Sequence, residues 1–196
     1  MKRIFDIIVS IIILLLFLPF GIVISLFIAI ESPGGIFYKQ KRVGRKGMEF
    51  DLYKFRSMRP DSDRQGKLTI GDRDPRITRA GYFIRKFKLD EFPQFFNVLK
   101  GDMSIVGPRP EVREYVDLYT EEERNILKVR PGITDYASIE YFEEAKLLSQ
   151  SEDPRTTYVQ EVMPAKIRLN QKYIENPTLW QDLKIMGMTF RKMIGF

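Results

Sequence analysis

An uncharged apolar stretch near the N-terminus constrains this chain more than any other feature. Ile7 to Ile30 is a run of 24 residues without a formal charge, and about 20 such residues suffice to cross the hydrocarbon core of a bilayer. The basic start is typical of a signal peptide, but the apolar run is too long and no small-residue cleavage site ends it. The run therefore predicts a membrane segment.

The charges at the two ends of this segment bear on how it meets the bilayer. Lys2 and Arg3 precede it, and a cluster of Lys and Arg follows at 39–46, so the positive-inside rule keeps both flanks in the cytoplasm. Pro19 lies mid-segment, where proline removes a backbone hydrogen bond and bends a helix. These features favour a re-entrant helix broken at Pro19, although spanning helices also tolerate proline. We expect residues 1–33 to form a monotopic anchor and residues 34–196 a cytoplasm-facing catalytic domain.

The composition excludes several kinds of active site. The 196 residues contain no cysteine and no histidine, which excludes Cys/His zinc sites, disulfides, thiolate nucleophiles and Ser-His-Asp triads. Catalysis would have to use carboxylates, Lys, Arg, Tyr, hydroxyl groups or a metal ion held by oxygen.

The positive charge is concentrated in one block. The net charge is +6, yet residues 36–88 carry 16 Lys or Arg against 6 Asp or Glu. Such a block beside a membrane segment indicates anionic lipid, a phosphorylated substrate or nucleic acid. A membrane-anchored basic module that binds nucleic acid or anionic lipid without catalysis therefore stays open as an alternative.

The rest of the chain predicts an α+β, mostly helical domain. Two period-two runs, 36–43 and 49–58, are typical of a β-hairpin, and a polar loop at 59–77 is long enough to be mobile or to close over a ligand. Helices follow, and their expected ranges and signals are 79–88 after Thr78, 91–100 between Asp90 and Gly101, 120–129 with Thr120 and Glu123 as a capping box, 158–175 with a bend at Pro164, and a final amphipathic helix, core or interfacial, after Thr178.

Two adjacent acids, Asp90 and Glu91, stand at the expected start of a helix. The simplest interpretation of Asp90 is a helix cap. A cap does not require Glu91, however, and repulsion between two neighbouring carboxylates raises one pKa unless a cation or metal compensates. Arg85 precedes the pair, and Arg109 follows in the Pro-flanked turn GPRP, a setting that suits bidentate phosphate binding.

This arrangement indicates Mg²⁺ and phosphate chemistry, with a carboxylate as the candidate covalent nucleophile. A two-carboxylate glycosidase fits poorly, because adjacent residues do not flank a bond from opposite sides.

Three motifs together resemble a known family. They are YKFRSM, DPRITRAGYFIRKFKLDEFPQFFNVLKGDMSIVGPRP and VRPGIT, and they follow the Pro-containing membrane segment in that order. The chain resembles, over nearly its whole length, the bacterial sugar transferase family, the small monotopic polyprenyl-phosphate phosphoglycosyl transferases that initiate glycan assembly.

The resemblance implies a reaction in two steps at the inner membrane of a bacterium, on its cytoplasmic face. Asp90 would attack the β-phosphate of a nucleoside-diphosphate sugar, expected to be a UDP-sugar, and release UMP. Undecaprenyl phosphate would then accept the phosphosugar, the first membrane-committed step of glycoconjugate or polysaccharide synthesis. The resemblance leaves a homodimer open and implies no nucleic-acid partner.

The resemblance also assigns roles to individual residues. Glu91 would act as a base or share a Mg²⁺ site with Asp90. The residues implied to bind substrate phosphates are Arg109, Arg85, Lys54, Arg56 and Arg130.

The chain departs from the family pattern in three places. After RPGIT it continues DYASIEYFEEAKLL, where relatives carry a Gly, Ala-Gln and Gly-Arg pattern, and this difference leaves the sugar open. Asn170 stands where many relatives carry Asp, and we assign it no role. Phe87 and Lys88 replace small hydroxyl residues.

Overall fold

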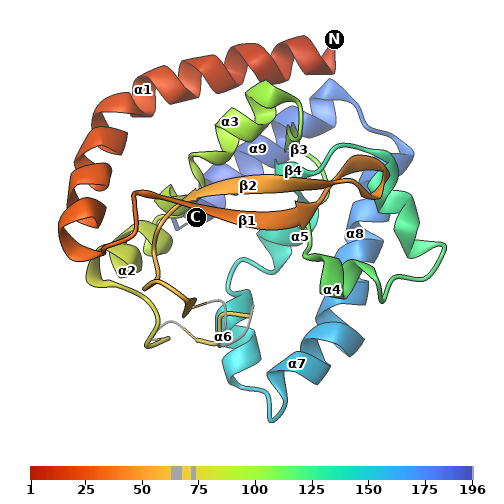
Figure 1. Ribbon diagram of the computed structural model, residues 1–196. Coiled ribbons are helices and arrows are strands. Elements are labelled where there is room, and N and C mark those ends of the chain that lie inside the picture. The colour runs from red at the N-terminus through yellow and green to blue at the C-terminus, as the bar shows by residue number, and fades with distance from the viewer. Residues whose placement is uncertain (63–67, 72–73, 196) are drawn as a thin grey trace.

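The computed structural model describes residues 1–62, 68–71 and 74–195. Helices predominate in the described residues, beside two small two-stranded sheets (Figure 1), which confirms the predicted α+β, mostly helical class. The α-helices are α1 Lys2–Glu31, α2 Arg79–Lys86, α3 Gln94–Lys100, α4 Arg113–Val116, α5 Tyr136–Glu140, α6 Glu144–Ser149, α7 Pro154–Thr157, α8 Met163–Glu175 and α9 Leu179–Met193.

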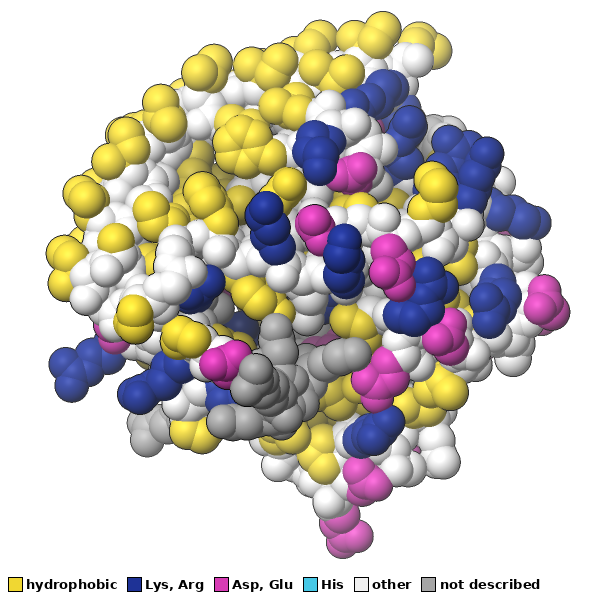
Figure 2. All heavy atoms as spheres, viewed as in Figure 1, with side chains coloured by type: hydrophobic (Ala, Val, Ile, Leu, Met, Phe, Trp, Pro, Cys, Tyr) yellow, Lys and Arg dark blue, Asp and Glu magenta, His cyan; other side chains and the backbone are white. Residues whose placement is uncertain are grey.

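The apolar segment forms one long helix, α1, which arches around one side of the domain and bends near the middle of its length (Figure 1). Its most apolar stretch of 18 residues has a mean hydropathy of 3.2, so the helix is long and apolar enough to cross a membrane. Hydrophobic side chains cover its outer curve (Figure 2), and within α1 only Asp6, Ser10, Ile24 and Ile28 are buried.

The structure shows no interruption of α1 at Pro19, where a break was predicted. The helix continues through Pro19, because losing one backbone N–H leaves the neighbouring helical hydrogen bonds in place. The prediction of a broken helix was therefore too strong, and the helix is bent instead.

The first half of α1 is tied to the domain by polar contacts. The Arg3 guanidinium donates to the Leu99 carbonyl at 2.9 Å and also to that of Val98, at the C-terminal end of α3, where a cation is favoured by unpaired carbonyls and the helix dipole. The buried Asp6 carboxylate accepts hydrogen bonds from the Ser104 hydroxyl at 2.8 Å and the Ile105 N–H at 3.3 Å.

The far end of α1 is tied to the same domain. The Glu31 carboxylate accepts from the backbone N–H groups of Arg79 at 2.7 Å and Ala80 at 2.6 Å, in the first turn of α2. Both ends of the apolar helix thus contact the same domain.

The predicted hairpin is confirmed. Strands β1 (Phe37–Val43) and β2 (Glu49–Phe55) pair antiparallel, with Phe37 opposite Phe55. The hairpin extends across the middle of the molecule in Figure 1, on one side of α3 and α9.

A second sheet was not predicted. Strands β3 (Ser104–Val106) and β4 (Gly132–Thr134) pair in parallel. Next to this pair the backbones of Gly107 and Gly132 approach so closely that a Cβ on Gly132 would lie 2.1 Å from the Gly107 nitrogen. Strands of three residues carry too little periodicity to be recognised from sequence.

Most of the predicted caps are confirmed. The side chains of Thr78 and Thr178 accept from the N–H groups of Gly81 and Gln181, and Thr120 and Glu123 form the reciprocal hydrogen bonds of a capping box. The element after that box is a 3-10 helix, Glu123–Lys128, rather than an α-helix.

The predicted helix at 158–175 begins differently from the expectation. A π-helical turn, Tyr158–Val162, leads into α8, and Pro164 lies in the first turn of α8. Proline has no N–H, and an irregular turn before it accommodates the missing bond.

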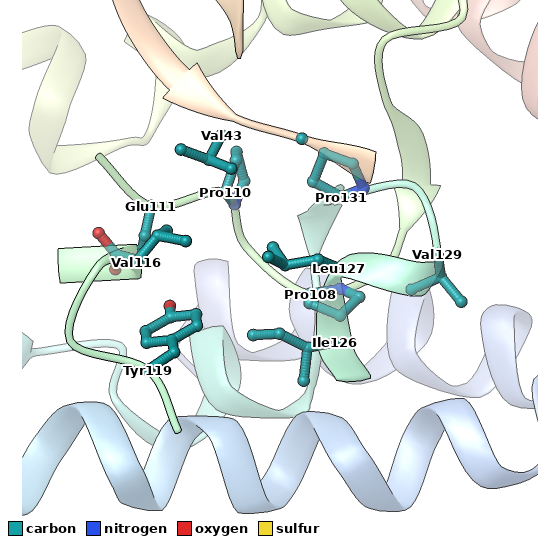
Figure 3. Close-up of a pocket in the computed structure, with 11 residues that line it drawn as sticks. Val43, Pro108, Pro110, Glu111, Val116, Tyr119, Ile126, Leu127, Val129 and Pro131 are labelled. Atoms are coloured by element: carbon teal, nitrogen blue, oxygen red, sulfur yellow. The ribbon is translucent and has the colours of Figure 1, made fainter. Parts of the chain in front are cut away.

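The buried apolar residues that the structure describes pack in three clusters, centred on α4 with α8, on α3 with α9, and on the second half of α1. The small pocket in Figure 3, among Val43, Tyr119 and Pro131, has a volume of about 10 Å³. It has room for one water at most. Helix α9 buries Asp182 and Ile185 but exposes Trp180 and Phe190, as an interfacial helix would.

Candidate active site

The adjacent acids lie on a tight turn between α2 and α3. Lys88 has a left-handed backbone (φ 55°), and Leu89–Glu91 then form a single 3-10 turn. The predicted cap at Asp90 is wrong, because α3 begins only at Gln94, after Pro93, and the Asp90 side chain caps no helix. The strained turn instead buries Asp90, which is 4% exposed, and a strained backbone is common at functional sites.

Glu91 is held by two cations. The Arg109 guanidinium donates to both of its carboxylate oxygens, to Oε2 at 3.1 Å and also to Oε1, and the Lys54 Nζ lies 3.3 Å from Oε1. Burial alone would raise the pKa of Glu91, but the charges of Arg109 and Lys54 outweigh it and hold that pKa well below its usual range. Glu91 is therefore a fixed carboxylate ion.

Asp90 differs from its neighbour. Among the residues that the structure describes, none donates a hydrogen bond to its carboxylate at normal distance. Burial raises the pKa of Asp90, the Lys54 charge opposes this shift, and the Glu91 charge adds to it. Burial likewise lowers the pKa of Lys54. One carboxylate of the pair is thus locked by a guanidinium, while the other lacks any such hydrogen bond.

Arg109 is placed by the strand pair β3–β4. It lies between Pro108 and Pro110, just after β3, and its backbone N–H donates to Asp135 Oδ2 at 3.0 Å, just after β4. The Glu91 charge raises the pKa of Arg109 and burial opposes this shift, so the guanidinium stays charged.

These side chains share one large open cavity of about 1110 Å³, ample for a nucleotide-sugar. Of the residues predicted to bind substrate, those that line it are Asp90, Glu91, Arg109, Arg85, Lys54 and Arg56. Arg85 donates to the Thr69 hydroxyl at 3.2 Å, and the half-buried Arg56 donates to the Pro33 carbonyl at 3.2 Å. Lys88, which was not predicted, also lines the cavity.

Arg130 lies elsewhere and needs a correction. It does not line the cavity, and its Nε donates to the Gly101 carbonyl at 2.9 Å, just past the end of α3. This placement argues against a phosphate-binding role for Arg130, because the side chain stabilises the C-terminal end of a helix. Sequence order alone did not reveal which way it points.

The predicted ligand loop at 59–77 falls partly outside the described residues, at 63–67 and 72–73. Its described parts line the cavity, and the Gly71 N–H donates to the Ala145 carbonyl at 2.9 Å. Whether the loop moves stays a prediction.

A second polar cluster in the same cavity was not predicted as a site. It consists of Arg42, Glu111, Glu144, Tyr158 and Lys166, joined by hydrogen bonds and ion pairs. The sequence features that point to this cluster are Glu144, in the divergent segment after RPGIT, and Glu111, just after GPRP. Neither indicates that α8 brings Lys166 between them.

The carboxylate oxygens of Asp90 and Glu91 suit a metal ion only in part. Within the described ranges, no group of three His, Cys, Asp or Glu residues could hold a metal by itself. Mg²⁺ needs only one or two carboxylates when phosphates supply the other oxygens. Asp90 fits this requirement, whereas both oxygens of Glu91 are already bound by cations.

The acids also lie close to the apolar helix. Phe92, next to Glu91, stacks on Phe17 of α1 with ring centroids 3.7 Å apart. Ile13 of α1 and Phe190 of α9 line the cavity that contains Asp90. The lining of the cavity thus includes apolar side chains from both helices.

Comparison with known families decides what kind of protein this is. The model of the family described as bacterial sugar transferase matches residues 1–195. The chain belongs to this family.

Several relatives within the bacterial sugar transferases have names that describe an activity. A UDP-N-acetylgalactosamine-undecaprenyl-phosphate N-acetylgalactosaminephosphotransferase of Aeromonas hydrophila is 41% identical over 100% of this chain and 44% of its own length. A putative undecaprenyl-phosphate N-acetylgalactosaminyl 1-phosphate transferase of Bacillus subtilis is 47% identical over 68% of this chain and 70% of its own length. A UDP-glucose:undecaprenyl-phosphate glucose-1-phosphate transferase of Escherichia coli is 35% identical over 98% of this chain. The chain spans less than half the length of the Aeromonas and Escherichia relatives, 44% and 40%.

Proposed function

We propose that this chain transfers a sugar 1-phosphate from a UDP-sugar to undecaprenyl phosphate through a covalent intermediate on Asp90. The observation that carries the proposal is the pairing at the adjacent acids: Glu91 is bound by Arg109 and Lys54, while Asp90 is buried in the same cavity without a hydrogen bond from any described residue. A weakly solvated carboxylate beside fixed cations suits attack on a phosphorus atom.

In the first step, a carboxylate oxygen of Asp90 forms a bond to the β-phosphorus of the donor. The bond from that phosphorus to the bridging oxygen breaks, and UMP leaves with the electron pair. Lys54, Arg85 and Lys88 line the cavity around the acid and would stabilise the phosphate charge.

In the second step, a phosphate oxygen of undecaprenyl phosphate attacks the same phosphorus. The aspartyl oxygen–phosphorus bond breaks, the lipid diphosphosugar forms and the Asp90 carboxylate is restored. Glu91 would position Arg109 for this reaction rather than act as a base, because its low pKa makes it a weak proton acceptor.

When bound, Mg²⁺ would neutralise charge on the diphosphate. Asp90 is the protein oxygen ligand that fits it best, since the cations already bind Glu91.

The attachments of α1 support a re-entrant helix. Asp6 and Glu31, near its two ends, both bind the catalytic domain, and the outer face between them is apolar (Figure 2). A helix that dips into one leaflet and returns places the catalytic domain on one face of the membrane, which we take to be the cytoplasmic face of the inner membrane. The acceptor phosphate and Asp90 then lie at the same depth.

The alternative of a basic module without catalysis is disfavoured by ion pairs. Within the basic block, Lys41, Lys54 and Arg42 pair with acids, so these cations are less available to nucleic acid than their number indicates.

The test is a reaction of the full chain, reconstituted in membrane, with undecaprenyl phosphate, Mg²⁺ and each of UDP-glucose, UDP-galactose and UDP-N-acetylgalactosamine. We expect UMP and a lipid diphosphosugar in equal amounts from at least one donor. Absence of a lipid product from all three, in a protein that unfolds cooperatively on heating, would contradict the proposal for these donors.

A further inference from the structure

The second polar cluster of the cavity has its own set of partners, and it is near enough to the adjacent acids for the Glu144 charge to raise the pKa of Arg109. Lys166 Nζ lies 2.8 Å from Glu144 Oε2 and 3.8 Å from Glu111 Oε1. Arg42 pairs with the other oxygen of Glu111 at 3.3 Å, and the Tyr158 hydroxyl donates to Glu111. All five residues line the cavity that contains Asp90.

The two regions of the cavity differ in charge. Around Asp90 and Glu91 stand Lys54, Arg85, Lys88 and Arg109, an excess of two positive charges. In the second cluster, two cations face two carboxylates, so its charges cancel. A diphosphate therefore favours the region of the adjacent acids, and an uncharged part of the donor favours the second cluster.

The second cluster offers hydrogen-bonding groups rather than a surface for stacking. Near the ring of Tyr158 lie the ring of Tyr115, with centroids 4.8 Å apart, and Lys166 Nζ, 5.3 Å from the centroid. A planar base would need an aromatic face that is open, whereas the hydroxyl and amide groups of a sugar suit carboxylate and ammonium partners. The chemistry of the cluster favours the sugar over the base.

Glu144 is the member of the cluster best placed to bind a ligand. It belongs to the divergent segment after RPGIT, and its side chain is 28% exposed while that of Lys166 is 11% exposed. The same segment reaches the residues just before Asp90, because Lys88 Nζ lies 5.0 Å from the centre of the Phe142 ring. The segment thus borders the cavity from the adjacent acids to the second cluster.

We propose that Glu144, positioned by Lys166, binds hydroxyl or acetamido groups of the donor sugar and sets which sugar is transferred. This inference rests on the proposed function. It predicts that the segment at 134–150 determines sugar choice while the adjacent acids perform the chemistry.

The test compares Glu144→Gln with the parent chain in the reconstituted reaction, using UDP-glucose, UDP-galactose and UDP-N-acetylgalactosamine. For the preferred donor we expect kcat/KM to fall about 10-fold or more, the effect of losing one charge-assisted hydrogen bond, and the preference among the three donors to shrink. The inhibition constant of UDP, which has no sugar, should stay unchanged. Glu140→Gln, on the exposed end of α5 outside the cavity, is the matched control.

The outcomes separate the two proposals. If the parent makes no lipid product with any donor, the proposed function fails. If the parent is active but Glu144→Gln keeps the same ratio among donors, the sugar subsite is wrong. If UDP inhibition weakens as much as turnover, the cluster binds the nucleoside instead. Glu144→Asp, which keeps the charge, should restore part of the preference.

Discussion

At the scale of single residues, the account depends on two neighbouring carboxylates in different environments. Glu91 is paired with Arg109 and Lys54, while Asp90 is buried without a hydrogen bond from any part of the chain that the structure describes. The sequence indicated that both acids belong to a site, because a cap does not need a second acid. It did not indicate which acid the cations bind, since that depends on the turn at Lys88 and the placement of Arg109 by β3 and β4.

The environment of Asp90 predicts that replacing this acid by asparagine raises the stability of the protein and lowers its activity. Because burial raises the pKa of Asp90, its charged form destabilises the folded state above that pKa. Asp90→Asn should therefore raise the melting temperature at pH 7 by a few degrees, about 2–4 °C for each kcal/mol in a chain of this size. The gain should shrink as the pH falls through the raised pKa, where the parent becomes neutral too.

The same variant should lose UMP release by about 10³-fold or more, because it lacks the nucleophile. Thermal unfolding at several pH values and the UMP assay check the two effects. Asp117→Asn, whose parent side chain is 58% exposed, is the control and should change neither. A lower melting temperature for Asp90→Asn at pH 7 would contradict the environment described for this acid.

Arg109, in the GPRP turn, and Arg130, in the VRPGIT motif, should respond differently to replacement by lysine. Arg109→Lys loses the bidentate hydrogen bonding to Glu91, so UMP release should fall about 10- to 100-fold. Arg130→Lys should keep activity within about 2-fold, since Arg130 bonds to the Gly101 carbonyl outside the cavity. Rates at saturating donor, with melting temperatures alongside, make the comparison. An equal loss in both variants would restore the phosphate-binding role first assigned to Arg130.

At the scale of helices and strands, the sequence correctly predicted the features that depend on neighbouring residues alone. The hairpin, the caps at Thr78 and Thr178 and the long apolar helix follow from alternation, capping chemistry and hydropathy. The β3–β4 pair does not, because it depends on the close approach of Gly107 and Gly132, which are distant in sequence. The 3-10 turn at the adjacent acids was missed because Asp and Pro favour a helix start by spacing alone.

The attachment of α1 to the domain provides a prediction at this scale. Asp6→Ala removes the acceptor for the buried Ser104 hydroxyl and the Ile105 N–H, and should destabilise the protein by about 2 kcal/mol or more. Ser10→Ala should be neutral or stabilising, because the buried Ser10 hydroxyl has no hydrogen-bond partner among the described residues. Thermal unfolding in the same lipid nanodiscs compares the two. Equal losses would mean that Asp6 does not anchor the helix.

At the scale of the whole molecule, the fold holds an apolar helix and a charged cavity side by side. Phe17 of α1 stacks on Phe92, next to Glu91, so moving the helix would move the catalytic turn. The half-buried Ile13 of α1 and the exposed Phe190 and Met193 of α9 line the same cavity. This arrangement suits the proposed transfer from a soluble donor to a lipid acceptor.

The re-entrant arrangement predicts the same membrane side for both flanks of α1. The chain lacks cysteine, so one cysteine inserted after the exposed Met1, or placed at the exposed Lys46, gives a single label site. In intact spheroplasts, an impermeant thiol reagent should label neither position, and both should react after permeabilisation. Labelling of one position but not the other would show that α1 spans.

The central claim is that phosphorus becomes bonded to Asp90 during turnover, and the mass of the intact protein tests it most directly. With a UDP-sugar that supports turnover and no lipid acceptor, the account predicts a gain of one sugar phosphate per chain, equal to the UMP released, mapped to Asp90 and lost when undecaprenyl phosphate is added. An unmodified mass under conditions in which added acceptor still yields lipid product, or an adduct on another residue, would contradict it.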